Sequence, residues 1–329
     1  MNPVLEVENL SVTFQYREGD VAALRNVSLR IDPGESLGVV GESGSGKSLT
    51  SAAIMGLLPN NASVTGSVRF LGQELLGAPE STLRDLRGRR LAIISQDALT
   101  ALNPVHTVGA QIAEAIRVHD SSHSRAELRA RAIELLDLVG IPQPSTRVDN
   151  YPHEFSGGMR QRALIAMSVA NEPDLIIADE PTTALDVTVQ AQVLDVLARI
   201  QARTSSSLML ITHDLGVVAG VADRVLVMYS GSVVEEAGVD DLFYKTTHPY
   251  TRGLLASLPR LDARDRSQPL YRIPGFQPAP VERPPGCPFH PRCDVAVAGL
   301  CDVERPLPIV VRTGHVASCH RAEIDGPIA

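Results

Sequence analysis

The stretch "GESGSGKS", residues 41–48, decides the fold. It follows a short apolar run, Leu37 to Val40, and leads into a helical pattern, "KSLTSAAIMGLL". The spacing G-x-x-x-x-G-K-S between a strand and a helix is typical of a loop that binds nucleotide phosphates. A plain glycine-rich turn is the alternative, and it fits less well because Lys47 is one of only two lysines in the chain.

Each residue type in this loop has a chemical role. Glycines let backbone N–H groups turn inward around phosphate oxygens, and the helix that follows adds positive potential. Lys47 is suited to reach the β- and γ-phosphates, and Ser48 is suited to bind Mg²⁺. The predicted ATP-binding set is Gly41, Glu42, Ser43, Gly44, Ser45, Gly46, Lys47, Ser48 and Leu49.

A second motif supports this interpretation. "LIIADE" has the pattern of a buried strand and ends in Asp179 and Glu180. Two adjacent carboxylates at the end of an apolar strand are costly unless a cation or a hydrogen-bond partner meets them. Asp179 is suited to hold Mg²⁺ through water, and Glu180 to polarise the attacking water. The alternative is a pair of solvated acids at a strand end.

The remaining patterns indicate an α/β fold. Apolar and polar residues alternate in 4–14 and 21–31, which predicts antiparallel strands. Other strands are expected at 37–40, 89–97, 174–181 and 207–214, helices at 125–139, 160–170 and 188–202, and a hairpin at 224–238. Buried strands that alternate with helices predict a mostly parallel sheet with helices on both faces.

The stretch "FSGGMRQR", residues 155–162, predicts a second anion site. Ser156, Gly157 and Gly158 open a predicted helix, and a helix N-terminus attracts anions. One nucleotide already has its phosphate loop at 41–48, so this second site should serve a nucleotide held by another domain. Two such domains are therefore expected to meet head to tail.

With these motifs, residues 4–238 resemble the ABC ATPase family, whose signature reads LSGGQ. The resemblance implies a P-loop NTPase fold with an antiparallel β subdomain and a helical subdomain at about 97–170. It also implies ATP and Mg²⁺ as cofactors and hydrolysis of ATP to ADP and phosphate. Met159 replaces the signature glutamine, which removes one polar contact but leaves the serine and both glycines.

The resemblance assigns roles to five further residues. Gln96 matches the residue that senses Mg²⁺ and the attacking water, and His213 matches the switch histidine that contacts the γ-phosphate. Asp186 lies in the segment that runs across the dimer. Phe14 occupies the place of the aromatic residue that stacks on adenine, with Tyr16 as its rival, and a core position for Phe14 is the alternative.

Three stretches resemble the ATPase subunits of oligopeptide and dipeptide importers. They are "QDALTALNPVHTVGAQIAEAI" (96–116), "HPYTRGLLASLP" (248–259) and "IPGFQPAPVERPPGCPFHPRC" (273–293). The resemblance implies a nucleotide-binding domain at 1–258 and an irregular extension at 259–329. Its implied partners are a related second ATPase subunit, two membrane permease subunits and, indirectly, an extracytoplasmic solute-binding protein.

Other functions stay open at this point. Import of nickel or glutathione by the same machinery is one alternative. A soluble ABC machine of DNA repair or translation is another, although the chain has neither a long coiled-coil insertion nor two cassettes. The net charge of −8 argues against a nucleic-acid partner. No apolar run reaches about 18 residues and no secretion signal is visible, so we expect a peripheral protein at the cytoplasmic face of the membrane.

All four cysteines lie in the extension. Their spacing is C-x5-C-x7-C-x17-C, without the C-x-x-C knuckle that zinc ribbons favour. Four soft thiolates suit a [4Fe–4S] cluster, and the tail is similar to iron–sulfur ligation in some peptide-importer ATPases. The predicted ligands are Cys287, Cys293, Cys301 and Cys319. Zn²⁺, unliganded or disulfide-forming cysteines, and a redox-sensing module with secondary ATP turnover are the alternatives.

Overall fold

The computed structural model describes residues 2–183, 185–258 and 271–322, so parts of the predicted extension, 259–270 and 323–329, lie outside the described residues. The chain divides into two compact units. The first comprises Met1–Leu5, Ile31–Glu35 and Phe70–Ile211, and the second comprises Glu6–Arg30, Ser36–Arg69 and Thr212–Ala329. Each unit is therefore built from segments that are distant in sequence.

Parallel strands form the centre of the first unit. β7 (Leu175–Asp179) pairs in parallel with β6 (Leu91–Ile94) on one side and with β8 (Ser207–Thr212) on the other. Nearly all their residues are buried, as expected when both faces of a sheet are covered. The predicted strands are confirmed, except that β6 ends at Ile94, so that Gln96 lies past its end. The polar residues that follow Ile94 interrupt the apolar run.

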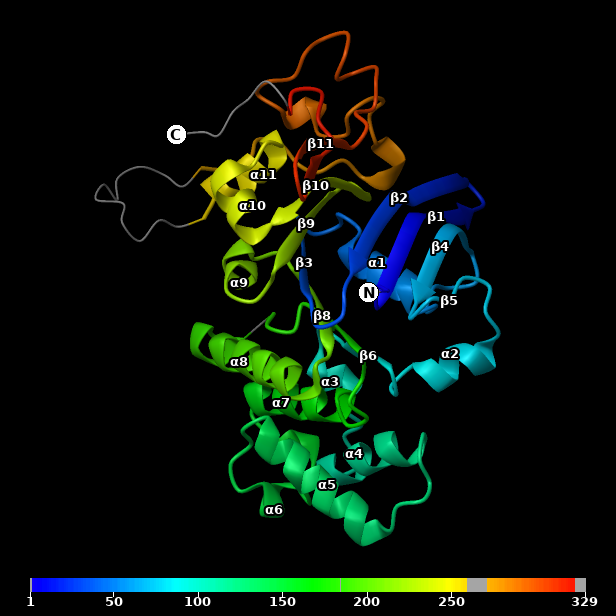
Figure 1. The fold of residues 1–329 in the computed structure, drawn as a ribbon, viewed down its shortest axis with the longest axis vertical. Coiled ribbons are helices and arrows are strands. Elements are labelled where there is room, and N and C mark those ends of the chain that lie inside the picture. Colours follow the sequence, from blue (N-terminus) through cyan, green and yellow to red (C-terminus); the bar gives the residue numbers. More distant parts are fainter. Residues whose placement is uncertain (1, 184, 259–270, 323–329) are drawn as a thin grey trace, which may run out of the picture. The chain divides into compact units, whose positions relative to one another are not determined.

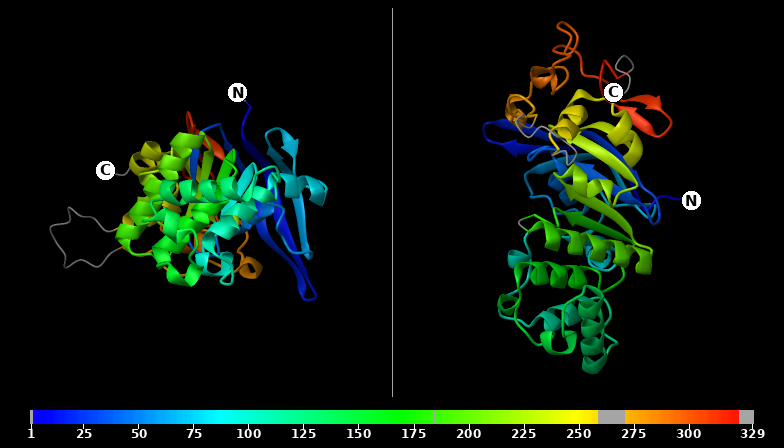
Figure 2. Two further views of the ribbon diagram at one scale, coloured as in Figure 1. Left: turned by 90° about the horizontal axis from the view of Figure 1, so that it is seen from below. Right: turned by 90° about the vertical axis from the view of Figure 1, so that its left-hand side faces the viewer.

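Helices make up most of the rest of the first unit. The first unit contains β5 (Gln73–Glu74), α2 (Glu80–Leu86), α3 (Ala98–Ala101), α4 (Val108–Arg117), α5 (Arg125–Leu138), α6 (Pro144–Arg147), η1 (Pro152–Glu154), α7 (Gly157–Ser168) and α8 (Val187–Thr204). Helix α7 contacts α4, α5 and α8, and it lies between α8 and the other two (Figures 1 and 2). A capping box joins Ser124 and Glu127 at the start of α5.

The second unit contains two sets of strands. β1 (Leu5–Tyr16) and β2 (Gly19–Ile31) are neighbours joined by two residues, so they run in opposite directions, and β4 (Ala62–Phe70) lies on the other side of β1. β3 (Ser36–Val40) pairs in parallel with β9 (Arg224–Tyr229). β9 continues through an antiparallel hairpin into β10 (Ser232–Gly238), which confirms the predicted turn at 230–231.

The extension also contributes strands to this unit. β12 (His315–Ala317) pairs with β10, and β11 (Ile309–Arg312) pairs with β12, both antiparallel. The prediction of an irregular extension is therefore incomplete. Its remaining described elements are the short helices η2 (Pro280–Glu282) and η3 (His290–Arg292).

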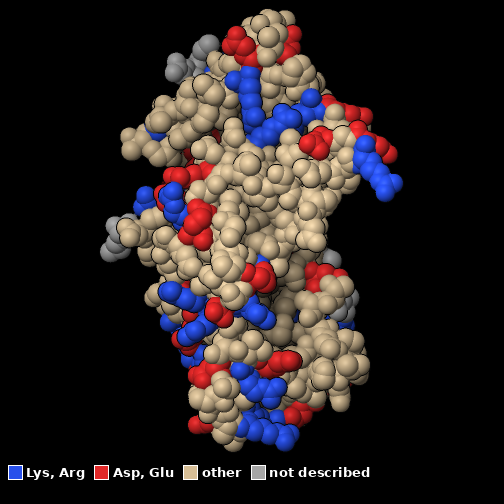
Figure 3. Space-filling model, turned by 90° about the vertical axis from the view of Figure 1, so that its right-hand side faces the viewer, with Lys and Arg blue, Asp and Glu red and all other residues tan. Residues whose placement is uncertain are grey.

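The surface carries both signs of charge close together. On the face shown in Figure 3, many basic side chains lie next to acidic ones, and uncharged residues cover the rest. No helix among the described residues is long and apolar enough to cross a membrane.

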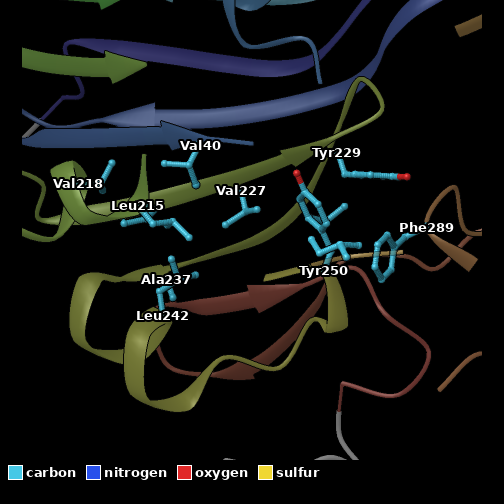
Figure 4. Close-up of a cluster of buried hydrophobic side chains, with 12 residues drawn as sticks. Val40, Leu215, Val218, Val227, Tyr229, Ala237, Leu242, Tyr250 and Phe289 are labelled. Carbon is cyan, nitrogen blue, oxygen red and sulfur yellow. The ribbon is translucent and has the colours of Figure 1, made fainter. Parts of the chain in front are cut away.

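Residues from the extension complete the core of the second unit. The helices of the second unit are α1 (Lys47–Ile54), α9 (Leu215–Ala219), α10 (Val239–Lys245) and α11 (Pro249–Ala256). Tyr229, Tyr250 and Phe289 pack together in this core, with ring centroids 4.7–5.4 Å apart (Figure 4). Because Phe289 belongs to the extension and is 3% exposed, this part of the tail is not an independent appendage.

A buried carboxylate ties β10 to the residues before α11 and to β12. Glu235 accepts hydrogen bonds from Thr246 Oγ1 (2.8 Å), Thr247 N (2.7 Å) and His248 N (3.3 Å), and it bonds His315 Nε2 at 2.7 Å. Burial alone would raise the pKa of Glu235, but the bonds from His315 and Thr247 outweigh it and lower the pKa to about 2. The carboxylate is therefore ionised in the folded chain.

The buried His248 predicts a pH-dependent stability. Burial lowers its pKa from 6.5 to about 4, and its Nδ1 accepts a bond from Tyr250 N at 3.1 Å. Between about pH 4 and pH 6.5, His248 is protonated in the unfolded chain but neutral in the folded chain. Lowering the pH from 6.5 towards 4 therefore destabilises the folded chain, by about 3 kcal/mol in all, whereas above pH 6.5 His248 causes no such loss.

Denaturant titrations between pH 8 and pH 4.5 measure this loss. The replacement His248→Gln keeps an acceptor for Tyr250 N and removes the titration, so its stability should depend less on pH over this range. A wild-type free energy of unfolding that stays constant from pH 7 to pH 5 contradicts the prediction.

Candidate nucleotide-binding site

The loop at 41–48 joins β3 to α1, as the sequence predicts. Gly46 caps α1 with φ +105°, and a Cβ at this position would lie 2.6 Å from Leu24 Cδ2, so only glycine fits. Lys47 is 4% exposed, and its Nζ donates to the carbonyl oxygens of Gly41 (2.8 Å) and Glu42 (3.1 Å). The ammonium group thus lies against the loop, while Ser48 is exposed at the start of the helix.

In the first unit, the structure brings two predicted catalytic residues together. Glu180 Oε2 accepts hydrogen bonds from Thr183 Oγ1 at 2.8 Å and from Gln96 Nε2 at 3.4 Å. Glu180 directly follows Asp179, the last residue of β7. Its φ of +49° is uncommon for a residue with a side chain, although Glu172 has a similar value. Sequence reasoning missed Thr183.

The predicted second anion site is the start of α7. Ser156 is the N-cap, and its Oγ accepts a bond from Met159 N at 3.3 Å. A Cβ on Gly157 would meet nothing within 4 Å, whereas one on Gly158 would lie 2.5 Å from Val189 Cγ1 in α8. Gly158 therefore allows α7 to approach α8, and Gly157 leaves the helix N-terminus open. The predicted helix at 160–170 begins three residues earlier than expected.

The other predicted residues occupy strand and helix ends. Asp186 caps α8 and accepts a bond from Val189 N at 3.0 Å. His213 is exposed and follows β8 directly. Phe14 is half-buried and Tyr16 is 56% exposed, with ring centroids 6.3 Å apart near the end of β1. This geometry keeps both aromatic rings as candidates for the adenine.

Two contacts to the phosphate loop were missed by sequence reasoning. Arg292 forms two hydrogen bonds to the carboxylate of Glu42, at 2.6 and 2.9 Å. Tyr250 Oη accepts a bond from Glu42 N at 2.8 Å. The stretches at 248–259 and 273–293 indicated the family, but nothing in their pattern indicates which residue they would contact.

The chain has a phosphate loop, a strand that leads into two carboxylates and a helix that begins with two glycines. Together these features define a P-loop nucleotide-binding protein of the ABC class. Residues 24–183 match the family model described as ABC transporter. Residues 234–301 match the model described as oligopeptide/dipeptide transporter, C-terminal region.

Two relatives and one solved structure agree with these matches. The oligopeptide transport ATP-binding protein OppD of Mycobacterium bovis is 52% identical over 98% of this chain, and the chain spans 53% of that relative's length. The dipeptide transport ATP-binding protein DppD of Bacillus subtilis is 48% identical over 97% of this chain and 95% of its own. The dimeric structure of the ATP-binding cassette MJ0796 with ADP and Pi covers 71% of this chain and 98% of its own, with 27% identity and a TM-score of 0.65.

The chain belongs to the ATP-binding proteins of the oligopeptide/dipeptide ABC transporter family. The predicted family and fold class are thereby confirmed.

Proposed function

We propose that this chain hydrolyses ATP to drive the import of di- and oligopeptides through separate membrane subunits. The match of residues 234–301 to the oligopeptide/dipeptide C-terminal region is the observation that favours peptides as cargo. The relatives, which are named for oligopeptide and dipeptide transport, support the same substrate class. Nickel and glutathione are the alternative cargoes.

The chain's own residues suit the binding of MgATP. Amides of the loop at 41–48 and the Lys47 ammonium would bind the β- and γ-phosphates, and Phe14 or Tyr16 would stack on the adenine. Ser48, Gln96 and Asp179 would hold Mg²⁺, which supplies neutralisation of the phosphate charge. The open glycine loop suits phosphate, and hydroxyl, amide and carboxylate oxygens are donors of the type that Mg²⁺ prefers.

Hydrolysis would depend on two further residues. The Glu180 carboxylate would accept a proton from the attacking water, and its bonds to Thr183 and Gln96 would hold it in place. His213 would contact the γ-phosphate from the end of β8.

The remaining residues imply partners. Ser156, Gly157, Gly158 and Asp186 would contact the nucleotide of a second, related ATPase subunit in a head-to-tail dimer. The solved relative is a dimer, which supports this arrangement. The region after Gln96 would receive the permease subunits at the cytoplasmic face of the membrane, with a solute-binding protein on the other side.

Transport assays in proteoliposomes test the proposal. The chain is reconstituted with its membrane subunits, its partner ATPase and the solute-binding protein, and labelled dipeptide, pentapeptide, glutathione and Ni²⁺ are offered separately. ATP-dependent uptake of the peptides supports peptide import, and uptake of glutathione or Ni²⁺ alone redirects the cargo. ATPase activity that the membrane subunits never change favours a soluble ABC machine.

We also propose that the four cysteines hold a [4Fe–4S] cluster, with Zn²⁺ as the alternative. Cys287, Cys293, Cys301 and Cys319 line one small pocket beside Phe289, so four soft donors from separate loops face a shared space. Burial raises the pKa of Cys287 to about 11, and the neighbouring thiols add to this effect. A bound cation would reverse this effect by stabilising the thiolates.

The four cysteines suit a cluster by the chemistry of their sulfur atoms and not by the distances between them. The described residues include no group of three or more His, Cys, Asp or Glu side chains arranged to hold a metal ion. The thiols are free, and the loops that carry them would have to close around the metal. A bound cluster would then hold together a tail that has few regular elements.

Replacing Cys293 with alanine is expected to release most of the metal and to lower the melting temperature of the tail's unit. Protein is purified without oxygen, and its iron, sulfide and zinc contents are measured together with its absorption spectrum. Ser318→Ala, next to Cys319, is the matched control and should retain the metal. A Cys293→Ala protein with wild-type metal content contradicts the prediction, and zinc without iron favours the alternative.

A further inference from the structure

A bidentate ion pair joins the extension to the phosphate loop. Arg292 Nη1 donates to Glu42 Oε2 at 2.6 Å, and Arg292 Nη2 donates to Glu42 Oε1 at 2.9 Å. The arginine side chain is 6% exposed and the glutamate side chain 30%, so water reaches the pair mainly from the side of Glu42. Paired, charge-assisted bonds of this kind fix the orientation of both groups. The side chain of the loop's second residue is therefore held in one position.

Arg292 is itself fixed by its surroundings. Its Nε donates to the carbonyl oxygen of Pro274 at 2.8 Å, and its guanidinium carbon lies 5.8 Å from the centroid of the Tyr229 ring. Burial opposes its charge, but the bonds to Glu42 and Tyr229 outweigh burial and raise the pKa of Arg292. Figure 4 shows Tyr229 beside Tyr250 and Phe289, the core from which this support comes. The ion pair is thus attached to the buried aromatic core of the unit.

The extension and α11 also restrain the loop backbone. Tyr250 Oη accepts the hydrogen bond of Glu42 N, and Glu42 O accepts one from Lys47 Nζ. Gln277 Nε2 lies 3.3 Å from the position that a Cβ on Gly44 would occupy. The loop's conformation consequently depends on Tyr250 and Arg292 as well as on β3 and α1.

We infer that Arg292 is a positioning residue that, through Glu42, sets how tightly the chain binds ATP. This inference rests on the proposed function, because it requires ATP at the loop. A loop whose amides are already turned inward loses less entropy when phosphate binds. Without Arg292 the loop samples other conformations, and ground-state binding of ATP and ADP weakens together.

The replacement Arg292→Gln tests the inference. The dissociation constants of MgATP and MgADP, measured by titration calorimetry on the full chain, are expected to rise about tenfold. The KM for ATP should rise by a similar factor, while kcat at saturating ATP changes less than about twofold, since the hydrolysing residues are untouched. Arg292→Lys keeps the charge but not the two parallel bonds, and it should recover part of the affinity.

Arg305→Gln is the matched control. This extension arginine donates to Ser232 Oγ at 2.7 Å, and its replacement should leave the affinity for MgATP unchanged. Glu42→Gln should reproduce the Arg292→Gln effect, and the double variant should be no worse than either single one, as expected for one shared contact. Melting temperatures confirm that each variant is folded.

The outcomes separate this inference from the proposed function. A folded Arg292→Gln protein with wild-type affinity overturns the inference, and Glu42→Gln decides in the same way if Arg292→Gln does not fold. Lys47→Ala is the reference for loss of phosphate binding. If the wild type binds no ATP, or Lys47→Ala binds it normally, the proposed function fails and the inference fails with it.

Discussion

Replacing Glu180 with glutamine is expected to lower steady ATP hydrolysis by about 10²–10⁴-fold, the range typical of a removed general base. Glutamine keeps the shape of the side chain and can still bond Thr183, but it cannot accept the proton of the attacking water. The phosphate loop is unchanged, so MgATP should bind and a nucleotide-bound dimer with the partner ATPase should accumulate. Phosphate release and light scattering with MgATP measure the two effects.

Glu172→Gln provides a control for the loss of one carboxylate from the same unit. Glu172 bonds Arg131 at the surface, and its replacement should leave hydrolysis within about twofold of wild type, as expected for an exposed ion pair. Turnover by Glu180→Gln at the wild-type rate would remove Glu180 from the mechanism. Loss of MgATP binding in the same variant would indicate a structural role instead.

Replacing Glu235 with alanine is expected to lower the free energy of unfolding by about 3–5 kcal/mol, as for a removed partner of a buried charged network. The donors from Thr246, Thr247, His248 and His315 would remain buried without their acceptor. Denaturant titration of the full chain measures the loss, and the melting temperature should fall with it.

Glu236→Ala is the matched control on the same strand. Glu236 bonds Arg224 and is partly exposed, so its removal should cost no more than about 1 kcal/mol. Equal losses from the two replacements would show that the buried network of Glu235 contributes no special stability.

The parts of the molecule that could be predicted from the sequence are those whose cause lies within a few neighbouring residues. The loop at 41–48 needs glycines and a lysine within eight residues, and "LIIADE" needs one apolar strand with two acids at its end. Helix α5 was predicted from its buried Leu128, Ala132 and Leu135, which share one face. In each case the physical cause lies within one element, so its signal is contiguous.

Contacts between distant segments left no such signal. Nothing near Glu42 indicates that its partner is Arg292, because an exposed acid in a loop has the same local pattern. β11 and β12 were missed since each is too short to show an alternation, and they form only because β10 offers an edge. Thr183 was missed because a single hydroxyl after an acidic pair is common.

The contact between Glu42 and Arg292 spans 250 residues, and this distance has a consequence for synthesis on the ribosome. At about 5–20 residues per second, the loop emerges about 10–50 s before the arginine that holds it. A growing chain therefore carries the phosphate-loop sequence long before the contact with Arg292 can form. Nascent chains should bind nucleotide weakly until Arg292 has been translated.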